Sequence, residues 1–216
     1  DHRDLHTAYR RQRQMCIRDS SFAETIKVAC VGDSITYGAG IKDRKNMNYP
    51  VQLGKILGKK YEIKNFGNSG STMLKKGDKP YWKQREFKAA LEFNPNIVVI
   101  KLGTNDTKPQ NWKHGDDYLD DYKSMISMFS NLSSKPKIYI CLPVPVVQTR
   151  WGITDEIVNE KIIPTLKKIS EQTKCKIIDL NTPFHKKHNL IPDKVHPNAK
   201  GATIIAKEVA ESILNS

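Results

Sequence analysis

Ile97-Val98-Val99-Ile100 is a stretch of four apolar β-branched residues, and residues 138–142 (Ile-Tyr-Ile-Cys-Leu) form a second stretch without a charged residue. A strand with one face in water alternates apolar and polar side chains, whereas these stretches do not alternate. Such runs are typical of central strands in a parallel sheet that is covered by helices on both faces. The two stretches therefore predict the middle of a buried parallel sheet.

Five short β-rich stretches occur along the chain, and the segments between them include stretches that repeat apolar residues with a period near 3.6, as amphipathic helices do. Strands and helices that alternate in this way predict a parallel sheet between two layers of helices. We therefore predict an α/β fold, a three-layer α/β/α sandwich around a five-stranded parallel sheet. The predicted strands span residues 26–31, 61–65, 97–102, 137–142 and 176–180, and the predicted helices span residues 49–57, 118–132, 155–173 and 198–214.

The composition is that of a single globular domain. A chain of 216 residues is long enough to bury a full hydrophobic core. The formal net charge is +13, but the lysines occur as scattered pairs that do not gather with aromatic residues, so we expect a solvated surface and no nucleic-acid partner. No apolar run is long enough to cross a bilayer, so we expect no membrane span. Attraction to an anionic glycan stays open as an alternative use of the positive charge.

The first residues differ in character from the rest of the chain. Residues 10–14 (Arg-Arg-Gln-Arg-Gln) show neither a hydrophobic period nor a strand signal. Residues 15–20 (Met-Cys-Ile-Arg-Asp-Ser) match the translation of a transposon end used in sequencing-library preparation. We therefore expect residues 1–21 to be a non-native or disordered segment, a sequencing artefact, and residues 22–216 to form the domain. A genuine basic tail is the alternative.

Four groups of small and polar residues lie after predicted strands. Residues 32–34 (Gly-Asp-Ser) follow the first strand, residues 65–70 (Asn-Phe-Gly-Asn-Ser-Gly) the second, and residues 103–106 (Gly-Thr-Asn-Asp) the third. Residues 193–197 (Asp-Lys-Val-His-Pro) come after the fifth strand. Ligands of open α/β sheets bind outside the carboxyl ends of the strands, so we expect these four loops to meet on one rim.

A serine, a histidine and an aspartate in these loops form a candidate nucleophilic triad. A hydroxyl becomes a good nucleophile when an imidazole takes its proton, and the imidazole needs a third group that fixes its tautomer. Asp193 precedes His196 by three residues, so its carboxylate can bond Nδ1 while Nε2 faces Ser34. These residues predict ester hydrolysis.

The four loops resemble the four sequence blocks of the GDSL esterases, within the SGNH hydrolase superfamily, over residues 26–214. The resemblance implies a flavodoxin-like SGNH hydrolase fold that needs neither a metal nor an organic cofactor. Gly67 also lies in the second block, but the pattern Asn-x-Gly-x-Ser-Gly places the oxyanion glycine last. The resemblance implies that Ser34 is the nucleophile and that His196 and Asp193 are its triad partners. It also implies that the oxyanion donors are Ser34, Gly70 and Asn105.

Asp33 and Asp106 stand directly beside two of these positions. We expect both carboxylates to support their loops by hydrogen bonding and to take no part in the chemistry.

Three tryptophans, Trp82, Trp112 and Trp151, follow the second, third and fourth predicted strands and are tentative substrate-binding residues. Sugar rings stack on indole faces, but large aromatic side chains more often pack loops, and the sequence leaves both interpretations open. The segments around these tryptophans resemble bacterial carbohydrate O-acetylesterases of the sialate-esterase kind. This resemblance implies a serine esterase that removes acetyl groups from acetylated carbohydrates through an acetyl-Ser34 intermediate.

Two other functions stay open. A lysophospholipase or acyl-thioesterase of the same superfamily shares all four loops and differs in the length of the acyl chain that it accepts. A noncatalytic glycan-binding module would keep the tryptophans without needing Ser34. The expected partner is a small-molecule or glycan ester, and the sequence indicates no particular oligomeric state.

Residues 21–23 (Ser-Phe-Ala) resemble the small-x-small end of a secretory signal. We therefore expect a secreted or periplasmic protein whose signal peptide is truncated upstream, with a cytoplasmic location as the alternative. Outside the N-terminal segment, the cysteines are Cys30, Cys141 and Cys175, and their spacing matches neither a disulfide framework nor a zinc site. We therefore expect buried thiols, and the cysteines do not indicate a redox compartment.

Overall fold

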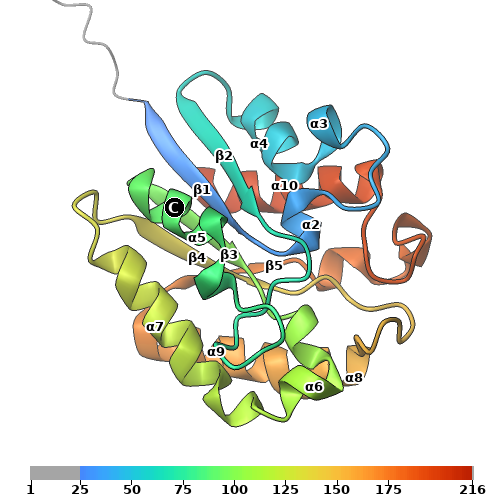
Figure 1. The fold of residues 1–216 in the computed structure, drawn as a ribbon. Coiled ribbons are helices and arrows are strands. Elements are labelled where there is room, and N and C mark those ends of the chain that lie inside the picture. Colours follow the sequence, from blue (N-terminus) through green and yellow to red (C-terminus); the bar gives the residue numbers. More distant parts are fainter. Residues whose placement is uncertain (1–24, 216) are drawn as a thin grey trace, which may run out of the picture.

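The structure, a computed structural model, describes residues 25–215. The expected artefact at residues 1–21 and the signal-like residues 21–23 lie outside the described residues. Within the described residues the strands form one five-stranded sheet in the order β2-β1-β3-β4-β5, with all neighbours parallel. Helices cover both faces of the sheet (Figure 1). The predicted three-layer α/β/α sandwich is confirmed.

The observed strands lie within two residues of their predicted bounds. Strand β3 is in the middle of the sheet, and all five of its residues are buried, as its unbroken apolar run predicts. Its last residue, Lys101, is a charged exception in that run. The strands are β1 (Ile26–Gly32), β2 (Tyr61–Gly67), β3 (Ile97–Lys101), β4 (Lys137–Leu142) and β5 (Lys176–Asp179).

Alternate residues of each strand enter two separate hydrophobic cores, one on each face of the sheet. Along β3, Ile97 and Val99 pack on one side, whereas Val98 and Ile100 pack on the other. The first side is covered by α4 (Tyr49–Leu57) and α10 (Ala199–Leu214), and the second by α5 (Arg85–Glu92), α7 (Tyr118–Ser130) and α9 (Ile163–Thr173) (Figure 1). Burial on both faces explains why the central strands show no alternation of apolar and polar residues.

The predicted helices at residues 49–57 and 198–214 are confirmed to within one residue, and α7 ends two residues before its predicted end. The predicted helix at residues 155–173 consists of three segments: α8 (Asp155–Ile157), a π-helical turn (Val158–Ile162) and α9. Pro164 stands in the first turn of α9 and has no backbone N–H to donate to the preceding turn. The wider π-helical turn lies where that hydrogen bond is lost.

Helix α5 and several elements of a single turn are not among the predicted elements. Helix α5 has only eight residues, and four of them (Arg85, Glu86, Lys88 and Glu92) are charged, so it lacks the long apolar stripe by which the longer helices are recognised. The one-turn helices are α2 (Ser34–Tyr37), α3 (Arg44–Met47) and α6 (Pro109–Trp112). The 3₁₀ turns are Tyr81–Lys83, Asn105–Thr107, Gly115–Asp117, Thr182–Phe184 and His188–Leu190.

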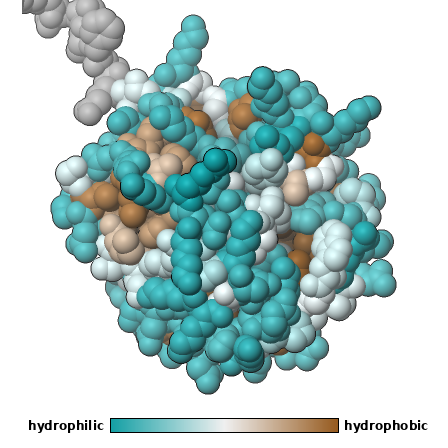
Figure 2. Space-filling view, in the orientation of Figure 1, coloured by the Kyte–Doolittle hydropathy of each residue, from teal (hydrophilic) through white to brown (hydrophobic). Residues whose placement is uncertain are grey.

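The surface is largely hydrophilic on the face shown in Figure 2, and hydrophobic residues are visible there in a few separate places. Of the large hydrophobic side chains, Trp151 and Leu214 are among the most exposed, at 55% and 59%. No helix between residues 25 and 215 combines the length and the apolar character that a membrane crossing requires.

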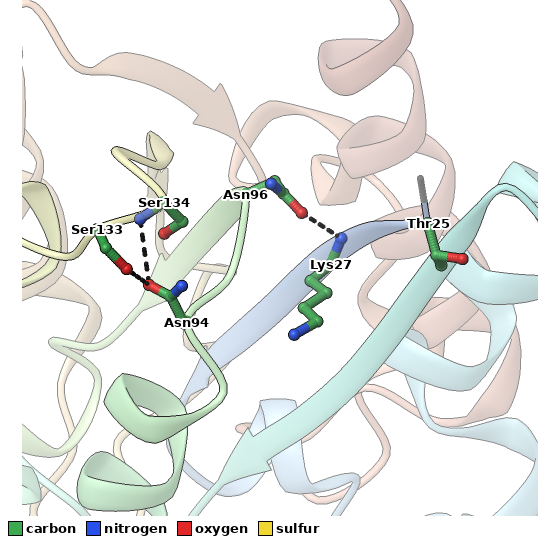
Figure 3. Close-up of a pocket in the computed structure, with 6 residues that line it drawn as sticks. All are labelled: Thr25, Lys27, Asn94, Asn96, Ser133 and Ser134. Carbon is green, nitrogen blue, oxygen red and sulfur yellow. Dashed lines mark hydrogen bonds between the residues drawn. The ribbon is translucent and has the colours of Figure 1, made fainter. Parts of the chain in front are cut away.

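A polar hollow of about 350 Å³ lies where β1 and β3 begin, at the end of the sheet opposite to Ser34 (Figure 3). Several of its polar groups bond to one another: Oδ1 of Asn94 accepts from Oγ of Ser133 and from the backbone N–H of Ser134, both at 3.2 Å. Oδ1 of Asn96 accepts from the backbone N–H of Lys27 at 2.8 Å. These bonds join the loops that precede β3 and β4, so we interpret the hollow as structural.

Candidate active site

Ser34 lies in the tight turn between β1 and α2, and two glycines make this turn possible. A side chain at Gly32 would collide with the backbone of Lys101, and a side chain at Gly67 would collide with the backbone of Tyr37. The two glycines stand opposite each other in the register of β1 and β2. Because neither carries a side chain, α2 packs directly against the end of the sheet and presents Ser34 as its first residue.

The structure brings Ser34, His196 and Asp193 into one hydrogen-bonded line. Nε2 of His196 lies 2.8 Å from Oγ of Ser34, and Nδ1 of His196 lies 2.7 Å from Oδ2 of Asp193. A proton on Nδ1 satisfies the carboxylate and leaves Nε2 free to accept the hydroxyl proton. The arrangement is that of a nucleophile, a base and an orienting carboxylate.

Asp193 also fixes the loop that carries the histidine. Its Oδ1 accepts from the backbone N–H groups of Val195 and His196 at 3.0 and 2.7 Å. Partial burial by itself would raise the pKa of Asp193, but these hydrogen bonds and the bond to the ring of His196 outweigh it and lower the pKa. The side chain is therefore a carboxylate near neutral pH, as its orienting role requires.

Asn105 and Gly70 line the same hollow as the serine. Nδ2 of Asn105 donates to the backbone oxygen of Ser71 at 3.2 Å, which fixes the orientation of the amide and leaves its second hydrogen for another acceptor. Gly70 has a φ of +83°, in the left-handed region that favours glycine. Nδ2 of Asn111 donates to the backbone oxygen of Asn105 at 2.8 Å and holds the Asn105 loop in place.

These groups share one open hollow of about 360 Å³. Ser34, His196, Gly70 and Asn105 all line it, although they come from four different loops. The convergence of the loops on one rim, expected from the sequence, is therefore what the structure shows. The complete lining consists of Ser34, Ala39, Ser69, Gly70, Asn105, Lys108, Trp151, Ile153 and His196.

Trp151 is the tryptophan that the structure brings to the hollow. It is 55% exposed, and its ring centre lies 5.7 Å from that of His196. Its φ of +52° is unusual for a residue with a side chain, and the guanidinium of Arg150 lies 4.5 Å from the centre of its ring. An exposed indole next to the base offers an apolar face to a bound molecule.

Trp82 does not line the hollow and is held within the protein. Its Nε1 donates to the backbone oxygen of Met73 at 2.7 Å, and its ring packs edge-on against Phe87. Its indole packs against the core on the α5 side of the sheet, which favours the packing interpretation of this tryptophan.

Trp112 does not line the hollow either. Its ring packs on Tyr118, and it borders a separate depression formed with Lys113, Gly115 and α9. This position favours the packing interpretation of Trp112 as well. A large aromatic side chain after a strand can point into the core or out to solvent. The sequence contains no signal that distinguishes these two orientations.

Behind the serine lies a buried ion pair that the sequence analysis missed. Nζ of Lys101 lies 3.2 and 3.1 Å from the two carboxylate oxygens of Asp33 and 3.0 Å from Oγ1 of Thr104. The side chains of Lys101 and Asp33 are 1% and 0% exposed. The available signal was one lysine at the end of a strand that is otherwise apolar.

Asp33 and Asp106 do support their loops by hydrogen bonds, as expected. Oδ1 of Asp33 accepts from the backbone N–H of Ile35 at 2.9 Å and caps α2. The two oxygens of Asp106 accept from the backbone N–H groups of Met73 and Leu74 at 3.0 and 2.7 Å. Burial raises the pKa of Asp106 to about 7, although these two N–H groups act in the opposite direction.

In the part of the chain that the structure describes, no three His, Cys, Asp or Glu side chains lie close enough together to bind a metal ion. Cys30 and Cys141 are buried, as expected, whereas Cys175 is partly exposed. The groups that line or border the hollow include the serine hydroxyl, the imidazole of His196, the carboxylate of Asp193 and the amide of Asn105.

Comparison with known proteins gives relatives of one kind. The chain is 39% identical to an acetylxylan esterase of Xylanibacter ruminicola over 88% of its length and 24% identical to a multidomain esterase of Ruminococcus flavefaciens over 91%. It spans only 43% and 29% of those two proteins. A solved carbohydrate acetylesterase from Sinorhizobium meliloti has the same fold, with a TM-score of 0.69, 16% identity, and coverage of 88% of this chain and 99% of that chain.

A family model also matches most of the domain. It covers residues 30–204, a range that contains Ser34, Gly70, Asn105, Asp193 and His196. With four fifths of the chain matched, this similarity shows that the chain belongs to the GDSL-like lipase/acylhydrolase family.

Proposed function

We propose that this chain is a serine esterase that removes acetyl groups from acetylated carbohydrates through an acetyl-Ser34 intermediate. The observation that carries the proposal is the 2.8 Å separation between Nε2 of His196 and Oγ of Ser34, with Asp193 bound to the other ring nitrogen. This geometry activates a hydroxyl for attack on a carbonyl carbon.

The first half of the reaction transfers the acetyl group to the protein. Oγ of Ser34 forms a bond to the carbonyl carbon while Nε2 of His196 takes the hydroxyl proton. The bond between the carbonyl carbon and the sugar oxygen then breaks, and His196 returns the proton to that oxygen as the sugar leaves. Asp193 stabilises the imidazolium through the 2.7 Å bond to Nδ1.

The negative charge that develops on the carbonyl oxygen needs donors that are already in place. We assign this role to the backbone N–H groups of Ser34 and Gly70 and to Nδ2 of Asn105. Their residues line the same hollow, and the bond from Asn105 to the Ser71 oxygen holds the amide nitrogen in one orientation.

The second half releases acetate. A water molecule in the open hollow gives its proton to Nε2 of His196 as its oxygen bonds to the acetyl carbon. The bond from that carbon to Oγ of Ser34 then breaks, and the proton passes from His196 to Oγ. The chain is returned to its starting state, and no electron transfer is involved.

Two features support a carbohydrate as the alcohol part of the substrate. Trp151 presents an exposed indole beside His196, where a sugar ring can stack. The most similar relative reported above, which is 39% identical, is an acetylxylan esterase. Polymeric glycans do not diffuse through membranes, so action on such a substrate favours a secreted or periplasmic location.

The proposal is tested by acetate release from a panel of acetylated oligosaccharides and polysaccharides, with the Ser34→Ala protein as the blank. We expect release by the unchanged protein and none above the blank by the variant. Equal rates for both proteins would contradict the proposal and favour a noncatalytic glycan-binding module. A series of p-nitrophenyl esters completes the test, because activity that rises with acyl chain length would favour a lysophospholipase or acyl-thioesterase.

A further inference from the structure

The interior behind the candidate active site contains a charged group with no part in the triad or the oxyanion hole. Lys101 is the last residue of β3, and its side chain is 1% exposed. Buried lysines are uncommon because loss of hydration disfavours the ammonium ion. Here the ammonium has three oxygen partners, two on Asp33 and one on Thr104.

Each partner stands next to a residue of the proposed chemistry. Asp33 immediately precedes Ser34, and Thr104 immediately precedes Asn105. Asp33 also accepts a hydrogen bond from the backbone N–H of Ile35, so its carboxylate fixes the turn that carries the nucleophile. One ammonium group thus bridges the nucleophile turn and the loop of an oxyanion donor.

Stability alone explains this ion pair poorly. Moving two charges out of water costs about as much as their attraction returns, and neutral side chains of similar size often serve equally well. The nearby thiol of Cys141 offers no second counter-charge, because burial raises its pKa well above its ordinary value. An ion pair that adds little net stability to the fold but has a fixed geometry is suited to holding two loops at a fixed distance from each other.

We propose that Lys101 is a positioning residue that sets the distance between Oγ of Ser34 and Nδ2 of Asn105 by bridging Asp33 and Thr104. It acts through these two residues and does not touch the substrate. The inference rests on the proposed function, because alignment of a nucleophile with an oxyanion donor matters only if Ser34 attacks a carbonyl or a similar centre.

The test uses Lys101→Met and the double variant Lys101→Met/Asp33→Asn. The double variant removes both charges and keeps an oxygen at position 33 that can cap α2, so it is expected to fold even if the single variant does not. For acetyl ester hydrolysis by the double variant we expect a KM within about 2-fold of that of the unchanged protein. We expect kcat to be lower by roughly 10- to 100-fold, because a small misplacement of the reacting groups lowers the rate by that much. An unchanged kcat in the double variant would overturn the proposal.

Val99→Ala serves as the matched control. Val99 is fully buried in β3, two residues before Lys101 and on the same face of the sheet, and it bonds to neither loop. A thermal melt compares the loss of stability in each variant. We expect Val99→Ala to keep kcat within about 2-fold despite a lower Tm, since its cavity lies away from both loops. A fall in kcat as large as that of Lys101→Met would mean that Lys101 matters for stability only.

A double-mutant cycle with Asn105→Ala separates positioning from general disturbance. If Lys101 acts by aligning Ser34 with Asn105, its replacement should cost less than about 3-fold in kcat once the amide is absent, because coupled residues are not additive. Full additivity of the two changes would overturn the proposal.

A second readout does not depend on acetyl ester hydrolysis. The rate at which a fluorophosphonate probe labels Ser34 also requires an activated hydroxyl and an oxyanion donor. We expect labelling of the double variant to be at least about 10-fold slower than labelling of the unchanged protein, by the same cost of misplacement. If the unchanged protein hydrolyses no acetyl ester, the proposed function fails, and the labelling rates still decide the role of Lys101: equal rates would overturn it.

Discussion

Nε2 of His196 lies 2.8 Å from Oγ of Ser34, although 162 residues separate them along the chain. The serine is fixed by the end of β1 and by α2, and the histidine by a loop that Asp193 closes immediately before α10. The parallel sheet brings both to the same rim, because the loops after its strands leave at one end.

Asp193→Asn should lower kcat for acetyl esters by roughly 10³- to 10⁴-fold, as expected when the base is held in the wrong tautomer. An amide nitrogen facing Nδ1 would place the ring proton on Nε2, which then cannot accept from Ser34. The measurement is kcat with a small acetyl ester. Asp179→Asn is the matched control, because Asp179 also accepts two backbone N–H bonds but bonds the hydroxyl of Thr182 and not the ring of His196. Comparable losses in both variants would contradict the role of Asp193.

Asn105→Ala should lower kcat by roughly 10²- to 10³-fold through loss of one oxyanion donor, with little change in KM. The reason is that the donor acts on charge that exists in the transition state and not in the bound ester. Steady-state kinetics with p-nitrophenyl acetate provide the measurement. A kcat close to that of the unchanged protein would remove Asn105 from the oxyanion hole.

Trp151→Ala should lower kcat/KM for an acetylated oligosaccharide relative to kcat/KM for ethyl acetate, by about 2- to 10-fold for one lost stacking contact. The ratio of the two kcat/KM values is the proper measure. The indole also contacts the ring of His196, so removing it lowers the activity toward both substrates. Trp112→Ala is the control, because Trp112 packs on Tyr118 away from the hollow. A ratio that shifts equally in both variants would exclude a sugar platform at Trp151.

Asp106 should make the fold less stable as the pH rises. Burial raises the pKa of Asp106 to about 7 in the folded chain, against an ordinary value of 3.8. Between these values the folded chain holds a proton that the unfolded chain has released, so the free energy of unfolding falls as the pH rises from about 4 to about 7 and is constant above. The full change is at most about 4 kcal/mol.

The measurement for Asp106 is urea unfolding of the unchanged protein and of Asp106→Asn between pH 5 and pH 8. Other titrating groups contribute equally to both proteins, so the difference between the two free energies isolates Asp106. As the pH rises, we expect the free energy of unfolding of the unchanged protein to fall relative to that of Asp106→Asn. Parallel curves would show that Asp106 is ionised throughout.

The strands and long helices could be predicted because their signals are local. The unbroken apolar run at Ile97–Ile100 reports burial on both faces of a strand, and the 3.6 period of α10 reports one buried helix face. Helix α5 was missed because it is only eight residues long and half of these residues are charged. The four loops could be placed on one rim since their order follows from a parallel topology.

The sequence by itself determined the fold class and the residue types of the site, because strand periodicity and the polar groups after strands are properties of short segments. The tertiary structure alone decided which of three tryptophans faces the hollow, and that Lys101 meets Asp33 and Thr104 behind Ser34. Side-chain direction and the pairing of buried charges depend on neighbours from distant segments. No local pattern in the chain encodes them.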